Sequence, residues 1–145
     1  MANQITTAWK QLMLGDAGIS GPTLPAVDGS AIITIGLIDT ADDTVTPNTD
    51  QDLADITGAA IVASGALTGV TITPSGANCF MAATAKTLTA VTGDSAEHIA
   101  VWNATGTAAT SLLMIHFDTF TSGMPVTPNG GDIVIAFHAS GIAQF

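Results

Sequence analysis

The sequence is poor in positive charge. It has no arginine and only two lysines, Lys10 and Lys86, against twelve acidic residues, which gives a net charge of -10. Proteins bind nucleic acids largely by replacing counterions with Lys and Arg side chains, and basic segments attach proteins to anionic membranes in a similar way. Neither mechanism suits this chain. We therefore predict that its partners include no nucleic acid and no membrane.

Long apolar runs and a secretory leader are also missing. Although 47% of the residues are apolar, no run approaches the roughly 20 residues of a spanning helix. The most apolar segments, residues 109–117 and 132–139, have the length of strands. The N-terminal Met1–Thr7 lacks the cationic and then apolar pattern of a secretory signal. These features predict a protein that is made and assembled in a cytoplasm.

Cysteine is almost absent, since Cys79 is the only one. A single thiol cannot form an intrachain disulfide, and it gives a structural zinc site too few thiolates. Because Phe80 and Met81 follow it, we predict that Cys79 is a small buried apolar residue. The length of 145 residues fits one domain, residues 1–145, and the low charge argues against disorder.

One segment has the period of an amphipathic helix. Apolar residues recur at helical spacing from Ile5 to Leu14, and Gly15 provides a stop. The stripe consists of Ile5, Ala8, Trp9, Leu12 and Met13. We predict a short N-terminal helix that packs Trp9 against a sheet.

The rest of the chain is typical of strands separated by turns. Apolar and β-branched segments alternate with Gly, Pro, Asn and Asp turn signals, which predicts a mainly β fold, an antiparallel β-sandwich or a partly closed barrel. A polar loop, Thr40–Gly58, interrupts this rhythm and contains one expected helical turn at Asp50–Ile56. The expected strands are Ala31–Asp39, Ala59–Ser64, Leu67–Thr73, Cys79–Thr84, Lys86–Val91, Glu97–Asn103, Thr110–Asp118, Asp132–Ala139 and Ile142–Phe145.

Several of these strands are apolar on both faces. In the segment 133–138, Ile133, Ile135 and Phe137 face one way, and Val134, Ala136 and His138 face the other. The segments 32–38 and 112–117 show the same property. Since large exposed apolar patches usually mark interaction sites, we predict that a partner or further copies of the chain bury part of this surface. A homo-oligomer is expected.

Half of the acidic residues lie close together in the segment 39–55. Asn48, Asp50 and Asp52 match the first alternating ligands of an EF-hand, but Leu53 and Ala59 replace its glycine and its final glutamate. A less regular calcium site remains open, as does a solvated loop whose carboxylates serve turns and caps. The candidate ligands are Asp39, Asp42, Asp43, Asp50 and Asp52.

No segment carries a catalytic signature. There is no nucleophile elbow and no phosphate-binding glycine loop, and His98, His116 and His138 lack a second His or Cys at ligand spacing. His116 with Asp118, or His98 with Glu97 and Asp94, could form an acid/base pair, but lone histidines on strands are more commonly structural, and we favour that interpretation. We predict no catalytic residues, no cofactor and no enzymatic activity. The absence of tyrosine also disfavours a lectin, and Trp102 is expected in the core.

A set of strand and turn patterns extends along nearly the whole chain, from the N-terminal segment Ala8–Leu12 to the last strand. Its main stretches are Ile35–Asp43, Leu53–Ile56, Ala63–Gly69, Leu88–Asp94, Ile99–Gly106, Leu112–Asp118 and Pro125–Ile133. In this order the stretches resemble a family of small tailed-bacteriophage virion structural proteins. None of them is a catalytic motif.

The resemblance implies a β-rich accessory protein of the virion, assembled in the host cytoplasm. Its partners would be the major capsid protein or other virion proteins. Because the acidic charge disfavours contact with packaged DNA, we expect a decoration or cement protein on the outer surface of the head. The alternative is a tail, collar or fibre component that takes part in host adsorption.

Overall fold

The computed structural model describes residues 4–7, 9–10, 32–75, 78–120, 122–139 and 141–144. Within this part the fold is mainly β, and its antiparallel sheets are all open. Three short 3-10 helices accompany the strands. The elements are β1 (Gln4–Ile5), β2 (Ile32–Ile38), η1 (Leu53–Asp55), η2 (Gly58–Ala60), β3 (Ile61–Ala66), β4 (Thr71–Ser75), β5 (Asn78–Ala82), β6 (Lys86–Leu88), β7 (His98–Ala104), η3 (Ala108–Thr110), β8 (Leu113–Phe117), β9 (Ile133–Ile135) and β10 (Ala143–Gln144).

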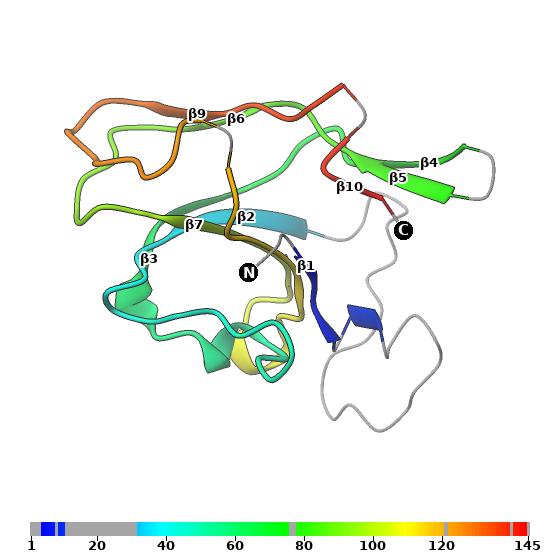
Figure 1. Ribbon diagram of the computed structural model, residues 1–145, viewed down its shortest axis with the longest axis horizontal. Helices are drawn as coiled ribbons and strands as arrows, with labels where there is room; N and C mark the ends of the chain where they lie inside the picture. The colour runs from blue at the N-terminus through cyan, green and yellow to red at the C-terminus, as the bar shows by residue number, and fades with distance from the viewer. Residues whose placement is uncertain are drawn as a thin grey trace.

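Two layers of strands face each other across the main core (Figure 1). One layer is a five-stranded sheet in the order β1-β8-β7-β2-β3. The other layer contains a three-stranded sheet, β10-β5-β4, and the pair β6-β9. Side chains such as Ile35, Val101 and Met114 of the large sheet contact Met81, Leu88 and Ile135 of the opposite layer. This packing fixes the two layers against each other.

The opposite face of the large sheet is also buried. The segment 39–60, with η1 and η2, runs below it, so that Val45, Ile56 and Ala60 pack on Trp102 and Leu113 (Figure 1). Strands covered on both faces favour apolar side chains on both, which explains the mostly apolar sequence of β2, β7 and β8.

This internal cover corrects the prediction that a partner buries the second face of these strands. For β2, β7 and β8, the cover comes from the loop of the same chain, because its buried apolar residues are spaced between polar ones that hid the pattern in the sequence. The segment around β9 differs, since Val134 is 61% exposed and Ala136 and His138 are exposed too.

Most expected strands are present, with altered ends. Two of the expected strands start later than predicted, because the 3-10 helices η2 and η3 occupy the first residues. β3 therefore begins at Ile61 and β8 at Leu113. β4 begins at Thr71 because Gly69 adopts a left-handed conformation, with φ of 63°, that interrupts extended backbone. The helical turn expected within 50–56 is confirmed by η1.

The N-terminal helix predicted for Ile5–Leu14 is not shown. Ile5 lies in β1, which pairs with β8. The Lys10 N–H donates to the Thr6 carbonyl at 3.1 Å, a helical hydrogen bond, but residues 11–14 lie outside the described residues. Trp9 is buried in the main core, as expected. The side chain of Cys79 lies outside the described part of the chain.

No helix among the described residues is long and apolar enough to cross a membrane.

Gly36 provides the space that Trp102 occupies between β2 and β7. A Cβ atom at Gly36 would lie 2.6 Å from the far edge of the Trp102 ring. We expect Gly36→Ala to lower the free energy of unfolding by about 1–3 kcal/mol, because the buried ring must move. Gly58→Ala is the matched control, since nothing lies within 4 Å of its added Cβ. Urea unfolding of both variants measures the difference, and equal effects would contradict this packing constraint.

Candidate functional site

Carboxylates in the segment 39–55 mainly bind backbone N–H groups. Asp43 accepts the Thr57 N–H at 2.6 Å, Asp50 accepts the Thr46 N–H at 2.6 Å, and Asp52 caps η1 through the Ala54 N–H at 2.9 Å. The bond from Thr57 is the main reason why the pKa of Asp43 lies below its usual value. These contacts fix the conformation of the loop, and its buried apolar side chains pack it against the sheet, so the segment is a structured cover instead of a fully solvated loop.

Two hydrogen bonds fix Asp39 at the end of β2. Asp39 is buried, with 4% of its surface exposed. Its carboxylate accepts the Ala41 N–H at 2.8 Å, and its own N–H donates to the Ala60 carbonyl at 2.9 Å. The side chain is therefore fixed before any partner binds.

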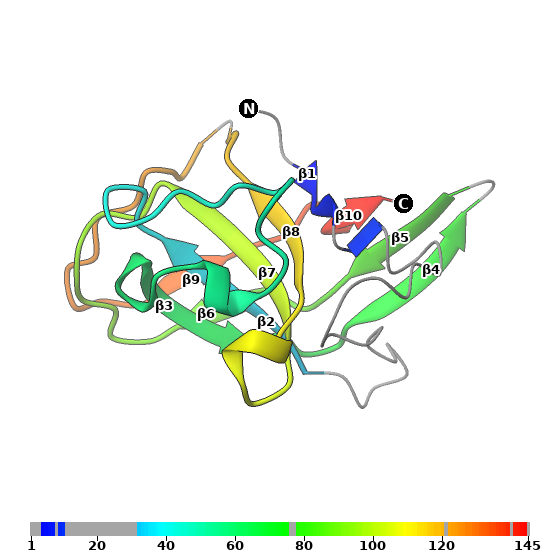
Figure 2. The same cartoon turned by 90° about the horizontal axis from the view of Figure 1, so that it is seen from below.

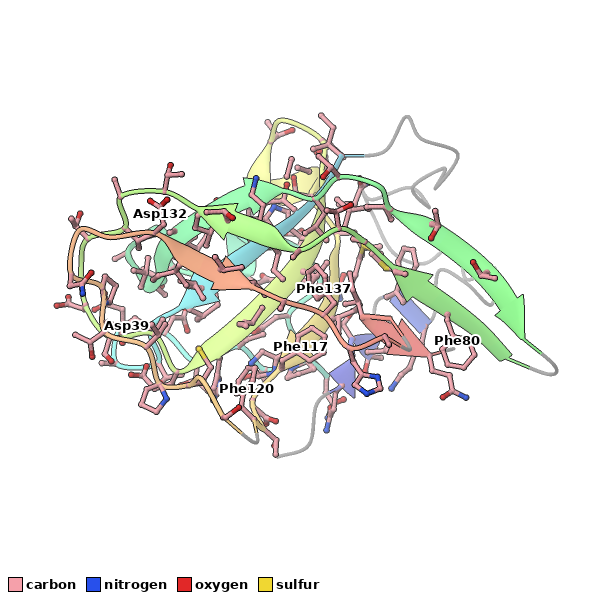
Figure 3. The ribbon with its side chains drawn as sticks, turned by 90° about the horizontal axis from the view of Figure 1, so that it is seen from above. Asp39, Phe80, Phe117, Phe120, Asp132 and Phe137 are labelled. Carbon is pink, nitrogen blue, oxygen red and sulfur yellow. The ribbon has the colours of Figure 1, made fainter. Side chains whose placement is uncertain are left out.

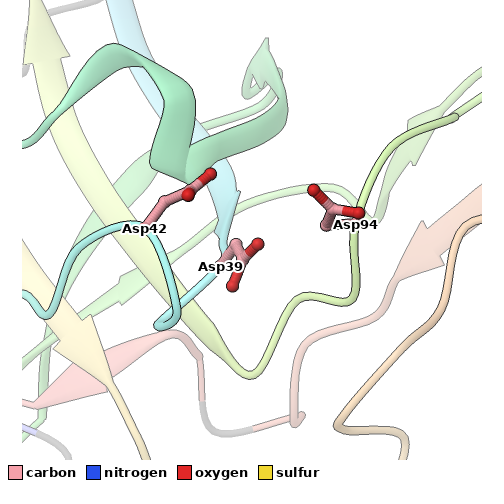
Figure 4. A group of neighbouring side chains, drawn as sticks. All are labelled: Asp39, Asp42 and Asp94. Atoms are coloured by element: carbon pink, nitrogen blue, oxygen red, sulfur yellow. The ribbon is translucent and has the colours of Figure 1, made fainter.

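Asp39, Asp42 and Asp94 form an acidic cluster at the end of the large sheet. One carboxylate oxygen from each lies within 4.8 Å of the others. Figure 4 shows that they come from the end of β2, from the loop that follows it and from the loop before β7. Asp42 and Asp94 are exposed, so solvent reaches the cluster from one side.

Such an arrangement of oxygens can hold a hard cation. Calcium takes six to eight oxygen ligands, so that three carboxylates would be completed by water and backbone oxygens. Of the predicted candidates, Asp39 and Asp42 are brought together, whereas Asp43 and Asp50 bind backbone groups of the loop, as does Asp52. Asp94 was missed because it lies about 50 residues away in sequence. Only the antiparallel pairing of β2 with β7 brings it near.

His98 and His116 form a second polar cluster, on neighbouring strands β7 and β8. His116 Nε2 lies 3.2 Å from His98 Nδ1, and the rings meet edge to face with centroids 4.9 Å apart. His116 is 1% exposed, and its Nδ1 atom has no hydrogen-bond partner among the described residues. One ring must donate and the other accept, so the contact requires at least one neutral imidazole.

Burial, together with the nearby His98, lowers the pKa of His116 to about 4, against the opposing effect of Asp118. Burial also lowers the pKa of His98, while Asp118 and Glu97 act in the opposite direction. Both histidines thus favour the neutral form at neutral pH. The other residue considered for acid/base chemistry, Glu97, accepts the Thr40 N–H at 3.1 Å and the Thr40 hydroxyl at 3.2 Å.

An apolar pocket of about 200 Å³ opens between the large sheet and the segment that follows β9. Phe117, Phe120 and Phe137 line it together with Ile35 and Ile135. Figure 3 shows the three phenylalanines near one another. His138 lies at this pocket, away from the His98–His116 pair. The lining gives the pocket the chemistry to hold an apolar group.

The buried His116 makes stability depend on pH. Its pKa is about 4 in the folded state and about 6.5 when unfolded, so the unfolded chain binds the proton first as pH falls. We expect the free energy of unfolding to stay constant above about pH 7. As the pH falls from about 6.5 to 4, it should decrease by up to about 3 kcal/mol. Lowered carboxylate pKa values, as for Asp43, act at still lower pH.

Urea unfolding of wild type, His116→Gln and His138→Gln across this pH range measures the effect. The His116 variant should flatten the pH dependence, and the variant at exposed His138 should retain it. A wild-type curve that is flat from pH 6.5 to 4 would show that His116 is not held neutral.

The acidic cluster predicts an unusual response to charge removal. In EDTA we expect Asp94→Asn to raise the free energy of unfolding by up to about 1 kcal/mol, because it relieves repulsion among three close carboxylates. Asp132→Asn is the contrast, since Asp132 accepts the Ala90 N–H at 3.0 Å and should give no gain. Thermal unfolding in millimolar calcium then tests cation binding: a bound ion would raise the wild-type midpoint and reverse the sign of the Asp94 effect.

Comparison with models of known protein families gives no match, and none of the curated proteins matches the sequence.

Proposed function

We propose that this protein is a non-enzymatic structural component of a tailed-bacteriophage virion, specifically a decoration or cement protein. It would bind in many copies to the outer surface of the head through the major capsid protein. The resemblance of its strand and turn pattern to small phage virion proteins provides the starting point. The arrangement of charge on the fold is the single observation that favours an outer, capsid-bound position.

Asp39 and Asp132 lie at the end of the described structure that is opposite to an uncharged hairpin. Residues 56–85 contain no Asp, Glu, Lys or Arg, and they include the hairpin formed by β4 and β5. In Figure 3 this hairpin, with Phe80, lies at one end, and Asp39 and Asp132 lie at the other. A protein that binds a lattice through its uncharged end would direct its acidic end away from that lattice and from the DNA within it.

The fold is consistent with a role as a rigid spacer between capsid proteins. We take the two strand layers as a β-sandwich, and the segment 39–60 adds a third layer below the large sheet. A sheet that is packed on both faces opens only when both cores are disrupted, which makes it a stiff spacer. Stiffness of this kind suits a subunit that must bridge neighbouring capsid proteins without unfolding.

Binding to purified capsids tests the proposal. We expect saturable binding to expanded heads at a copy number that follows the capsid symmetry, measured by quantitative gel analysis and by cryo-electron microscopy. Unexpanded or DNA-free particles lacking the mature lattice serve as the comparison. Localisation on tails, collars or fibres alone would overturn the head assignment and support the adsorption role, for which host-cell binding of the purified protein is the direct measurement.

A further inference from the structure

The hairpin of β4 and β5 projects from the body of the molecule (Figures 1 and 2). β4 is the outer strand of the sheet β10-β5-β4, and within the described residues no strand pairs with its outer edge. Thr71, Ile72 and Thr73 are exposed, and Ile72 is one of the most exposed large apolar residues, at 41%. An edge strand of this kind can accept another strand.

The direction of the backbone N–H and C=O groups shows which of them point outward from the edge of β4. The carbonyl of Met81 in β5 accepts the Ile142 N–H at 2.6 Å, so it points toward β10 and away from β4. Ile72 lies directly opposite Met81 in the antiparallel register. Residues opposite each other share the same bonding state, so the N–H and C=O of Ile72 point outward to the free edge.

The position of Pro74 is consistent with an outward-facing backbone at Ile72. Groups two residues apart in a strand point to the same side, so the position of Pro74 also faces outward. Its missing N–H therefore costs the hairpin no internal bond, as is usual for proline in edge strands. The outer edge retains the donor and acceptor of Ile72 and the carbonyl of Pro74.

Electrostatics selects which partner can approach this edge. Two copies of a chain with a net charge of -10 repel each other, but residues 56–85 carry no charge. Edge strands that stay single are commonly protected by charged side chains or by proline. β4 has no charge and one proline, Pro74, which removes one outward donor and leaves that of Ile72 in place. The hairpin of β4 and β5 projects away from the end that carries Asp39 and Asp132 (Figure 3). Contact between two such hairpins therefore keeps these acidic ends of two copies far apart.

We propose that β4 pairs with β4 of a second copy of this chain, antiparallel and around a two-fold axis at Ile72. Ile72 then exchanges both backbone bonds with Ile72 of the partner copy, and the two side chains pack across the axis. The same surface serves both subunits, as in other isologous dimers. The two three-stranded sheets join into one continuous sheet.

The pairing deepens the proposed function, because it names a contact through which neighbouring copies on a particle connect. It does not depend on the capsid for its test, so failure of either proposal leaves the other standing. One strand edge buries less than the roughly 1,600 Å² of a standard interface, and we therefore expect association at high concentration. Salt should strengthen it by screening the repulsion between acidic copies.

Sedimentation equilibrium of the full chain from about 10 µM to 1 mM, at low and high salt, measures this association. We expect a dimer whose dissociation constant falls as salt rises. Ile72→Lys should weaken it at least about tenfold, because it places like charges at the axis. Ile72→Pro should weaken it similarly, since it removes an outward N–H without breaking the bonds between β4 and β5.

The control is Val134→Lys, which makes the same change at an exposed position of β9 and should leave dimerisation unchanged. Circular dichroism and thermal unfolding establish that each variant is folded. A wild-type protein that stays monomeric at 1 mM overturns the proposal, including the case in which another part of the same chain covers the edge. Equal weakening by the Val134 and Ile72 variants, or dimerisation unaffected by both Ile72 variants, overturns it too.

Discussion

Burial of the large sheet on both faces is the constraint on which the other features depend. The strand layer above it and the segment 39–60 below it exclude water from both sides of β2, β7 and β8. Such strands can carry no charge, and their apolar content is therefore a consequence of position within the chain. The acidic residues of the covering segment stay at its surface or bind its backbone N–H groups.

The same constraint creates both polar clusters. Asp39 follows directly after β2, where the chain leaves the buried sheet, and pairing of β2 with β7 brings the loop of Asp94 to the same end. His98 and His116 lie beside each other because β7 and β8 are neighbours, and burial forces them to satisfy each other. Each cluster is thus made by the register of two neighbouring strands, β2 with β7 for the carboxylates and β7 with β8 for the histidines.

Asp39 and Asp132 lie at one end of the molecule, whereas the uncharged hairpin of β4 and β5 extends at the other. An acidic surface can therefore face outward from a particle while the uncharged hairpin of β4 and β5 makes contacts with other subunits. This arrangement links the proposed position on a virion with the proposed contact between copies, although the two rest on different residues.

The sequence by itself determined the mainly β class, the positions of most strands and the burial of Trp9 and Trp102, because apolar periodicity and turn residues act locally. It also identified the aspartate-rich segment. Only the tertiary structure decided that this segment covers the sheet, that Asp94 joins Asp39 and Asp42, and that β4 lies at an edge. The predicted N-terminal helix is not shown: its first residue, Ile5, pairs with β8, and residues 11–14 lie outside the described part of the chain. These features depend on which strands become neighbours in the folded chain. Local sequence patterns do not predict that pairing.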